Sequence, residues 1–436
     1  MTPDVVNVSV FFILALTVLL GAGIWIGLAL MALGYLGVAL FTPAPPVQVA
    51  GTAVWGALSS WTLAALPLFI WMGEILFRTR LSENMFQGLS PWVNRLPGGL
   101  LHVSVLASGV FAAVCGSSAA TTATVGQITL PELKKRGYDE SISIGSLAGA
   151  GTLGLLIPPS IILIVYGVAA EVSIVRLFIA GVIPGAILMA LFSGYIMLWA
   201  WLNPSRMPPP GPKLRLVEKL AASARLIPVM LLITVVILSI YLGIATATEA
   251  AVIGVVGAFA IAWWSGSLNR QTFRDSLMGA TRLSCMIALI IAGAAYLTAA
   301  MAHTGVPEAI ATAIGRSNLH PHVLLLLLTV LYIVLGTFLD GISMIVLTAA
   351  VVLPAVEAAG FDLIWFGIFV VILVEMAEIT PPVGFNLFVL QALAGRSMSY
   401  ITRAAIPFFL LMLVMLVITT VFPGIATWLP AQMFQR

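Results

Sequence analysis

The chain has 436 residues, of which 61% are hydrophobic and only 8% are charged. A soluble domain would carry about 25% charged residues, so this composition excludes a water-soluble protein and predicts an integral membrane protein. With 19 basic against 16 acidic residues, the chain also lacks the basic surface that nucleic-acid binding requires. The hydrophobic residues come in long blocks, which predict membrane-spanning helices and an all-α fold.

About ten stretches reach or exceed the ~20 apolar residues that a helix needs to cross a bilayer. These crossings are predicted at 6–22, 24–41, 61–78, 140–169, 174–202, 226–243, 247–265, 280–302, 363–394 and 403–428. Residues 203–225 are rich first in proline and then in basic residues, which predicts a stiff linker followed by an amphipathic segment. This linker separates a first half, 1–202, from a second half, 226–436.

Two further apolar stretches, 99–134 and 322–357, predict re-entrant hairpins instead of single crossings. Each is long enough for two short helices, and each has a polar break in its middle, at 115–118 and at 339–341. Non-helical backbone at membrane depth is tolerated only where protein or a water-filled cavity covers it. We therefore expect both breaks to lie inside the protein.

The basic residues predict the orientation of the chain. With the N-terminus outside and both hairpins returning to their own side, every Lys and Arg falls inside except Arg176, Arg316 and Arg436. This distribution follows the positive-inside rule. Treating either hairpin as a full crossing would invert every later loop, so both termini are expected on the outer side.

The two halves share residues at a constant offset. The segment LPELKKRGYD, from Leu130, recurs as LPAVEAAGFD from Leu353, and IPPS, from Ile157, recurs as TPPV from Thr380. Each half contains an odd number of predicted crossings and one hairpin, so the second half would be inserted upside down. Such an inverted-topology repeat is typical of secondary transporters, whose binding site forms where the broken helices meet.

Double prolines interrupt the crossings 140–169 and 363–394, directly after Ile157 and Thr380. Proline removes a backbone donor and clashes with the preceding turn, which frees carbonyl oxygens at mid-membrane. Free carbonyls suit a cation such as Na⁺, and the N-terminus of the resumed helix favours an anion. The alternative is a kink that only shapes packing, but two related double prolines favour a site.

The tip of the first hairpin, residues 115–122, is polar within an apolar block that has no charge from 96 to 131. Its Ser and Thr residues suit capping of the hairpin's second helix. The functional interpretation adds cation ligands and contact with a substrate at the helix N-terminus. The two interpretations are compatible, because a cap can also be a ligand.

Few acidic residues lie in apolar surroundings. Asp340 is the only charge in 317–356, and an intramembrane acid is a functional hypothesis by default. Its alternative role is to cap the second helix of the hairpin. Glu375 and Glu378 lie one turn apart before the second double proline, so that one could line a cavity or act as a protonatable coupling group. Glu249 begins a helix, where capping and a role in transport are both open.

Motifs of enzymes are missing from the sequence. No glycine-rich loop precedes a Lys-Ser/Thr pair, so ATP hydrolysis is not expected. The serines of the first tip have no His or Lys partner nearby in the sequence, which leaves an intramembrane hydrolase as a weak alternative. A membrane scaffold protein without transport is a third hypothesis. The residues favour a secondary active transporter.

Five segments carry a resemblance to a known family. In chain order they are GSSAATTATVGQITLPELKKRGYD, GTLGLLIPPSIILIVYG, ATATEAA, LGTFLDGISMI and ITPPVGFNLFVLQ. Together they resemble the large membrane subunit of tripartite ATP-independent periplasmic (TRAP) transporters, the DctM-like family, over essentially the whole chain. Two residues depart from the family pattern: Ala247 stands where Pro is usual, and Glu378 where a small or apolar residue is usual.

The resemblance implies a sodium-coupled, elevator-type importer of the ion transporter superfamily in the bacterial inner membrane. A mobile domain would contain both hairpins and both broken helices, and a scaffold would contain the other spans, including 6–78. A small membrane subunit would extend the scaffold, and a periplasmic binding protein would deliver an organic acid. The alternative is a stand-alone sodium/carboxylate symporter of the same fold.

The resemblance also implies two Na⁺ sites. The first would use Ser117 and Ser118 with the backbone of Gly154, Ile157 and Pro159. The second would use Asp340 and Thr380 with the backbone of Val383. Further candidates to line the substrate cavity are Gly116, Ala119, Thr121, Pro158, Gly341, Glu375, Pro381, Gly384 and Asn386.

Overall fold

The computed structural model describes residues 5–79, 81–209, 211, 213–309, 312, 320–381 and 384–433. Throughout these residues the regular structure is helical, as the sequence predicts. Six helices are long and apolar enough to cross a membrane, or up to seven if a bent pair counts as one span. The remaining apolar helices are shorter, because breaks divide them.

The first helices differ from the predicted spans in one respect. They are α1 (Val5–Gly21), α2 (Ile26–Phe41), α3 (Pro46–Leu58), the 3₁₀ turn η1 (Trp61–Ala64), α4 (Ala65–Phe77) and α5 (Leu81–Val93). No crossing is predicted at 42–60, whereas the structure forms α3 there, bent by 55° from η1 and α4. Pro46 opens this helix because proline suits the first helical position, where its missing N–H costs nothing.

The first hairpin and the first broken helix follow the predicted boundaries. They comprise α6 (Leu101–Cys115), α7 (Ser118–Lys135), α8 (Glu140–Thr152) and α9 (Ile161–Ala169), followed by the continuous α10 (Ile174–Leu202). Helix α6 ends at Gly116, whose φ of 59° is left-handed, a conformation that glycine adopts without steric cost. The hairpin pair α6 and α7 and the neighbouring α8 pack against one another.

The middle of the chain begins with the linker. Its helical parts are η2 (Pro204–Arg206), α11 (Leu216–Ser223) and η3 (Ala224–Leu226), and they lead to α12 (Ile227–Tyr241), α13 (Ala247–Trp264) and α14 (Arg270–Thr304). Helix α11 exposes Leu216, Val217 and Leu220, in line with the expected amphipathic segment. Helix α14 is 35 residues long and begins well before the predicted crossing at 280–302, because Asn269 caps it.

The second half ends in a further break. Its helices are α16 (Pro321–Gly336), α17 (Gly341–Ala358), α18 (Leu363–Glu378), α19 (Phe385–Ala394), α20 (Met398–Val421) and α21 (Gly424–Gln432). The predicted crossing 403–428 is wrong as a single helix. Phe422, at φ −121° and ψ 72°, ends α20, and Pro423 then caps the separate α21.

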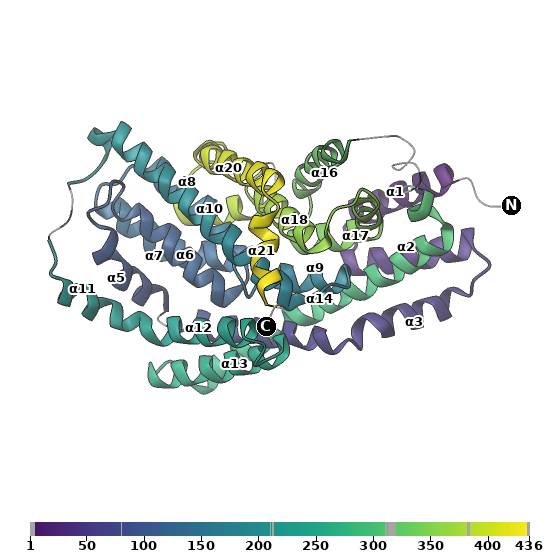
Figure 1. Cartoon of the computed structure of the whole chain (residues 1–436), viewed down its shortest axis with the longest axis horizontal. Coiled ribbons are helices and arrows are strands. Elements are labelled where there is room, and N and C mark those ends of the chain that lie inside the picture. The colour runs from purple at the N-terminus through teal and green to yellow at the C-terminus, as the bar shows by residue number, and fades with distance from the viewer. Residues whose placement is uncertain are drawn as a thin grey trace.

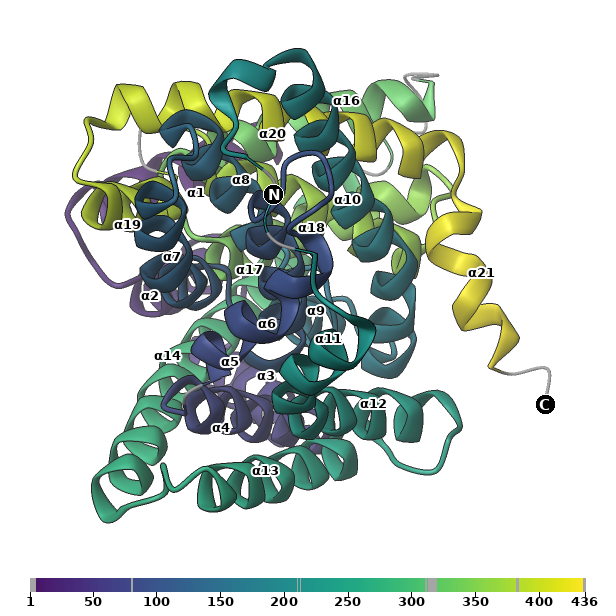
Figure 2. The same ribbon diagram turned by 90° about the vertical axis from the view of Figure 1, so that its left-hand side faces the viewer.

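The helices form two packed groups (Figures 1 and 2). In one group, here called the α14 layer, α14 packs against α2, α3 and α4, and α13 packs against α4 and α12. In the other, here called the hairpin body, α7 lies against α6, α8 and α19, while α18 lies against α16, α17 and α20. The hairpin body also includes α9, which packs against α17, and α10, which packs against α18. Helices α4 and α17 contact both groups, because α4 also touches α6 and α17 also touches α14.

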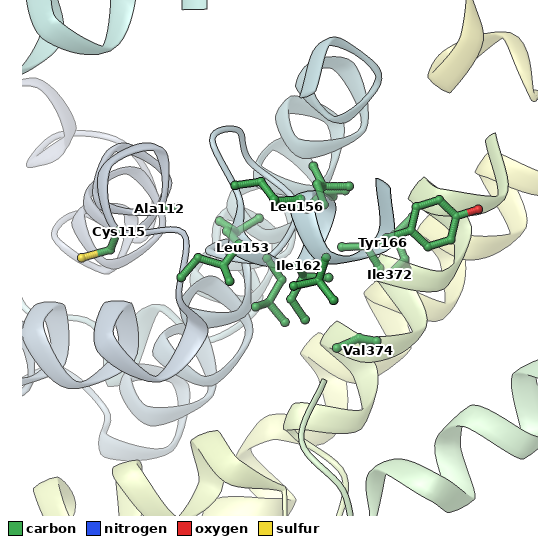
Figure 3. Packing of buried hydrophobic residues seen from close by; sticks show 14 of the residues in the cluster. Ala112, Cys115, Leu153, Leu156, Ile162, Tyr166, Ile372 and Val374 are labelled. Carbon is green, nitrogen blue, oxygen red and sulfur yellow. The ribbon is translucent and has the colours of Figure 1, made fainter. Parts of the chain in front are cut away.

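The core of the hairpin body surrounds the first break. Leu153, Leu156, Ile162 and Tyr166 are buried around the α8–α9 break, close to Ile372 and Val374 of α18 (Figure 3). Tyr166 packs against Phe366 of α18. On the outer surface, tryptophans near helix ends remain exposed: Trp25, Trp55, Trp61, Trp201, Trp263 and Trp264. Exposed tryptophans at helix ends are typical of the two membrane–water interfaces.

Candidate functional site

The first hairpin tip touches the first double proline directly. A Cβ atom at Gly116 would lie 2.9 Å from the carbonyl oxygen of Pro159 and 3.1 Å from the nitrogen of Ile161. The Ile161 N–H donates to the Gly116 carbonyl at 3.4 Å. A side chain at Gly116 would therefore separate the tip from the break.

Gly154 brings a second part of the break against the same tip. A Cβ atom there would lie 2.8 Å from the carbonyl oxygen of Ser117 and 3.0 Å from Thr121 Oγ1. Ile157, also in the break, turns its side chain towards Gly185 of α10. Ser117, Gly154 and Pro159, predicted as parts of one site, thus lie at one contact between tip and break.

The expected side-chain cap at this tip is absent. Ser117 is the N-cap residue of α7 but accepts no capping hydrogen bond through its side chain. Thr121 Oγ1 donates instead to the Ser117 carbonyl, at 2.7 Å. At the start of α9, by contrast, Ser160 Oγ accepts from Leu163 N at 3.4 Å. The first turn of α7 therefore presents N–H groups that no side chain caps.

A buried hydrogen bond joins the first tip to the second broken helix. Asn386, in the first turn of α19, donates from Nδ2 to Ser118 Oγ at 2.6 Å. Asn386 is 0% and Ser118 3% exposed. The N-cap residue of α19, Gly384, likewise provides no side-chain cap. The N-termini of α7 and α19 thus meet, and both lack side-chain caps.

Other predicted residues of these breaks have simpler surroundings. Ala119 is partly buried in the first turn of α7, and Pro381 is exposed. Pro158 and Pro159 line a small apolar gap with Phe178 and Ile240. The backbone of Val383, assigned to the second Na⁺ site by resemblance, lies outside the described residues, as does Pro382.

At the second tip, Asp340 caps α17. Its Oδ2 accepts from Ile342 N at 3.2 Å and from Ser343 N at 3.3 Å, and Ser343 Oγ donates to Oδ1. The capping role that the sequence leaves open is therefore present. The next residue, Gly341, packs against α9, because a Cβ there would lie 2.7 Å from Ile162 Cδ1.

Thr380 continues the end of α18 and does not hydrogen-bond to Asp340 within the described part of the chain. Its N–H donates to the Ala377 carbonyl at 3.0 Å, and its Oγ1 donates to the Met376 carbonyl at 2.7 Å. A Cβ atom at Gly384 would lie 2.8 Å from the Thr380 carbonyl oxygen, so these two residues lie close together.

The two acids of α18 have different surroundings. Glu375 is 0% exposed, and neither of its carboxylate oxygens has a hydrogen-bond partner among the described residues. Glu378 faces Asp340 and the N–H of Gly341, so it belongs to the second tip. The sequence could not decide between them, because both lie on the same side of the helix. Glu249 forms a capping box with Thr246, which fulfils its expected role as a cap.

Sequence reasoning missed two features between the helix groups. The first is a cavity of about 1130 Å³ whose polar lining includes Glu171, Ser173, Thr246, Glu249 and Thr298. It lies between α3, α13 and α14 of the α14 layer and α9, α10 and α17 of the hairpin body. Its sequence signal is the run of small residues in the second half of α14.

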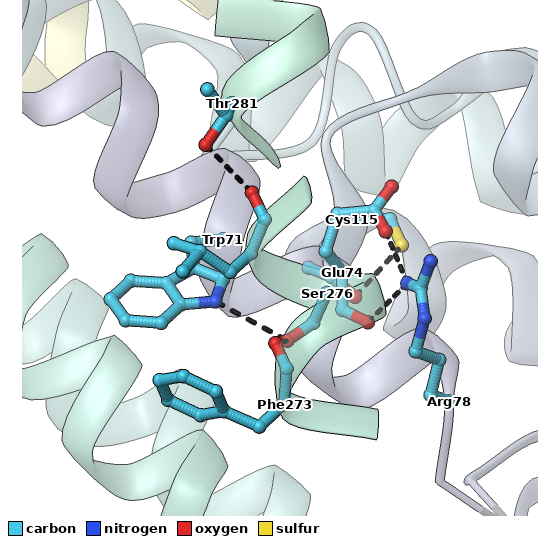
Figure 4. Close-up of polar contacts among 9 residues, drawn as sticks. Trp71, Glu74, Arg78, Cys115, Phe273, Ser276 and Thr281 are labelled. Carbon is cyan, nitrogen blue, oxygen red and sulfur yellow. Dashed lines mark hydrogen bonds and ion pairs between the residues drawn. The ribbon is translucent and has the colours of Figure 1, made fainter. Parts of the chain in front are cut away.

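The second missed feature is the contact of α4 with the first hairpin tip (Figure 4). A Cβ atom at Gly73 would lie 3.0 Å from Cys115 Cα, and the Cys115 thiol donates to the Gly73 carbonyl at 3.8 Å. The next residue, Glu74, pairs with Arg78 on the same helix. The sequence gives no signal for this contact, because the partners are far apart along the chain.

Comparison with known proteins identifies the family. Residues 11–425 match the family described as "Tripartite ATP-independent periplasmic transporter, DctM component". The chain belongs to this family. It is thus a multi-pass membrane permease component of a bacterial TRAP transporter and not an enzyme.

Individual DctM relatives agree over most of their length. The chain is 33% identical to the C4-dicarboxylate TRAP transporter large permease protein DctM of Pseudomonas aeruginosa, covering 91% of this chain and 92% of that protein. It is 32% identical to the isethionate TRAP transporter permease protein DctMQ of Oleidesulfovibrio alaskensis, covering 94% of this chain and 64% of that protein.

A solved transporter shares the fold of this DctM chain. The YdaH transporter of Alcanivorax borkumensis superposes with a TM-score of 0.69, covering 94% of this chain and 98% of that one. The sequence identity is 13%, so the likeness concerns the fold alone.

Proposed function

We propose that this DctM chain is the large permease subunit of a sodium-coupled secondary importer of organic acids. The observation that carries the proposal is the meeting of the α7 and α19 N-termini, joined by the Asn386–Ser118 hydrogen bond. Neither helix has a side-chain cap. Uncapped N–H groups and the positive ends of two helix dipoles favour an anionic group.

The substrate class is proposed from the same chemistry. A carboxylate between the two helix ends would accept hydrogen bonds from backbone N–H groups that no side chain satisfies. Asn386 Oδ1 is buried without a partner among the described residues, so it is available to a hydroxyl group of a substrate. The names of two relatives specify a C4-dicarboxylate and isethionate, which are both anions.

Sodium coupling is proposed from the oxygen atoms around the tips. Thr122 Oγ1 and Glu378 Oε2 are buried oxygens without partners among the described residues, which suits a hard cation. Ser117, Ser118, Gly154, Ile157 and Pro159 would form the first site, and Asp340, Thr380 and Val383 the second. Because Na⁺ is charged, its entry with the substrate would be driven in part by the membrane potential, which contributes about 2.3 kcal/mol per charge per 100 mV.

The proposed movement is that of an elevator. The hairpin body, which holds both tips and both breaks, would move against the α14 layer, and the cavity between them would change shape. The two halves would form an inverted repeat, with both termini on the periplasmic side of the inner membrane. The matching order of hairpin and broken helix in each half supports this proposal.

Two partners complete the proposed system. The family name specifies a tripartite transporter with a periplasmic component. The DctMQ relative extends well beyond the region that this chain matches, and we assign that extension to a small membrane subunit fused to the permease. For this chain we propose a separate small subunit and a periplasmic binding protein that delivers the substrate.

The test is uptake by proteoliposomes. Liposomes with the permease, its small subunit and the cognate binding protein should accumulate a C4-dicarboxylate when an inward Na⁺ gradient is imposed. We expect Asp340→Ala to abolish this uptake while expression and membrane insertion are retained, because the substitution removes both the cap and a carboxylate of the second tip.

Two outcomes would contradict the proposal. Wild-type rates of Na⁺-driven uptake in the Asp340→Ala variant would show that Asp340 is not part of the coupling site. Equal uptake by the permease alone, without a binding protein, would instead support a stand-alone symporter.

A further inference from the structure

We propose that Glu378 is an additional cation-binding residue of the second tip and supplies the negative charge that this site offers to Na⁺. The inference rests on the proposed sodium-coupled function and deepens it. It distinguishes two neighbouring carboxylates of the second site: Asp340 also caps α17 and shapes the tip, whereas Glu378 offers the cation an oxygen that no hydrogen bond occupies.

The carboxylate of Asp340 is already engaged. Oδ2 accepts two backbone N–H groups of the first turn of α17, from Ile342 and Ser343. Oδ1 accepts the hydroxyl of Ser343. These bonds, together with the positive end of the α17 dipole, satisfy the charge of Asp340 within the hairpin itself.

Glu378 is only partly engaged, because its carboxylate faces the N–H of Gly341 with one side alone. Its Oε1 lies 3.7 Å from the Cβ position of Gly341, at the start of α17. Its Oε2 has no accessible surface and no hydrogen-bond partner among the described residues. The free carboxylate oxygen at the second tip therefore belongs to Glu378, whose side chain reaches from the second broken helix to the second hairpin.

The position of Glu378 at the end of α18 adds to the demand for a positive charge. It is the last residue of that helix, where the helix dipole is negative. Glu375, one turn earlier, adds a second buried carboxyl group. No described Lys or Arg forms an ion pair with Asp340, Glu375 or Glu378, whereas Glu74, Glu132, Asp139 and Glu140 each have one.

A buried carboxylate oxygen without a hydrogen-bond partner suits a hard monovalent cation. Glu378 Oε2 is such an oxygen among the described residues. We infer that it strengthens Na⁺ binding at the second tip.

The experiment measures Na⁺ binding without transport. The purified permease is heated in detergent at increasing NaCl, with choline chloride holding ionic strength constant, and its unfolding midpoint is recorded. We expect the wild-type midpoint to rise saturably with Na⁺. Glu378→Gln should raise the half-saturating Na⁺ concentration by about tenfold or more, in the range found when a residue supporting a metal site is removed.

Matched variants separate charge from structure. Asp340→Asn should change the half-saturating concentration less than Glu378→Gln does, because Asn is an equally good N-cap. Glu378→Asp, which keeps the charge, should restore much of the affinity. Glu357→Gln, at the exposed far end of α17, serves as the control and should behave as wild type. Glu378→Ala provides the small residue that the family pattern expects, should the Gln variant not fold.

The outcomes are distinct. A wild-type Na⁺ response in both Glu378→Gln and Glu378→Ala would overturn the inference and leave the sodium-coupled function standing. If Asp340→Asn raised the half-saturating Na⁺ concentration more than Glu378→Gln does, Asp340 and not Glu378 would supply the negative charge of the site. A wild-type protein whose midpoint does not respond to Na⁺ would overturn both the inference and the proposed coupling.

Discussion

Gly116 and Gly154 set how closely the first tip approaches the first broken helix. A Cβ atom at Gly116 would lie 2.9 Å from the carbonyl oxygen of Pro159, and one at Gly154 would lie 2.8 Å from that of Ser117. Both distances are shorter than an ordinary contact of a Cβ atom. At the second tip, Gly341 instead lies close to the side chains of Val374 and Ile162. The polar groups of tips and breaks can therefore share one site only because these positions have no side chain.

Substitution of Gly116 tests this close approach. Gly116→Ala places a Cβ in a left-handed residue, which costs about 1–3 kcal/mol, and also forces the tip away from Pro159. We expect a lower thermal unfolding midpoint in detergent and a loss of substrate uptake. Gly137→Ala is the matched control, because Gly137 has φ +79° with nothing within 4 Å.

The control isolates the backbone contribution. Gly137→Ala should lower the midpoint but keep normal uptake, since no neighbour has to move. Equal losses of stability and uptake in the two variants would show that backbone conformation alone, and not contact with the break, accounts for the effect.

At the scale of elements, helix ends carry the proposed site. Helices α9 and α17 are capped by their own side chains, Ser160 and Asp340. Helices α7 and α19 are not capped in this way, although serine residues stand at the start of α7. The uncapped N-termini of α7 and α19 therefore suit an anion. The acidic residue at the C-terminal end of α18 suits a cation instead.

The contact of α4 with the first tip makes a prediction about movement. Gly73→Leu would insert a side chain between α4 and Cys115, and overpacking of a close contact costs about 1–3 kcal/mol. Because this contact joins α4 to the hairpin body that we propose moves, we expect the uptake rate in proteoliposomes to fall strongly, while the unfolding midpoint falls only modestly. Gly51→Leu on α3, where nothing lies within 4 Å, should leave both unchanged.

A result in which Gly73→Leu transports at the wild-type rate would indicate that α4 and the tip do not need to come together during transport. A midpoint lowered as strongly as the uptake rate would indicate that the contact serves stability only.

At the scale of the whole molecule, the two groups of helices enclose the large cavity between them. Its lining combines elements from both groups, so a relative movement of the groups would change its volume. The same arrangement exposes apolar side chains around the outside, together with tryptophans at helix ends. Such a surface is suited to contact with lipid. The orientation of the chain in the membrane is set by the basic residues of its loops.

The proposed orientation can be measured by labelling. In a background that lacks Cys115 and Cys285, Glu171→Cys lies in the α9–α10 loop and Ser265→Cys in the α13–α14 loop. We expect a membrane-impermeant maleimide added to spheroplasts to label the variant at 171 directly. The variant at 265 should be labelled only after permeabilisation, because that loop precedes Arg270 and Arg274 on the inner side.

The reverse labelling pattern would invert the proposed topology. The reverse pattern is also what a full crossing by the first hairpin would produce, because it would move both loops to the opposite side. Labelling of both variants in intact spheroplasts would instead contradict the three crossings predicted between them, since an even number of crossings would then separate residues 171 and 265.

Several parts of the fold follow from local sequence and were predicted from it. Long apolar blocks gave the boundaries of α10, α12 and α13, and the polar breaks gave both hairpin tips. The errors lie where local signals are weak. Helix α3 lies in a stretch for which no crossing is predicted, and the last crossing is interrupted at Phe422–Pro423 within an otherwise apolar run.

The sequence by itself determined the membrane setting, the helical class, the two breaks in each half and the residue types of the candidate site, because these depend on hydrophobicity and on backbone rules that act over a few residues. Only the tertiary structure decided which groups meet: Ser118 with Asn386, Gly116 with Pro159, and Glu378 with the Asp340 tip. Such contacts join residues from different helices, and close packing across hundreds of residues leaves no periodic signal in the chain.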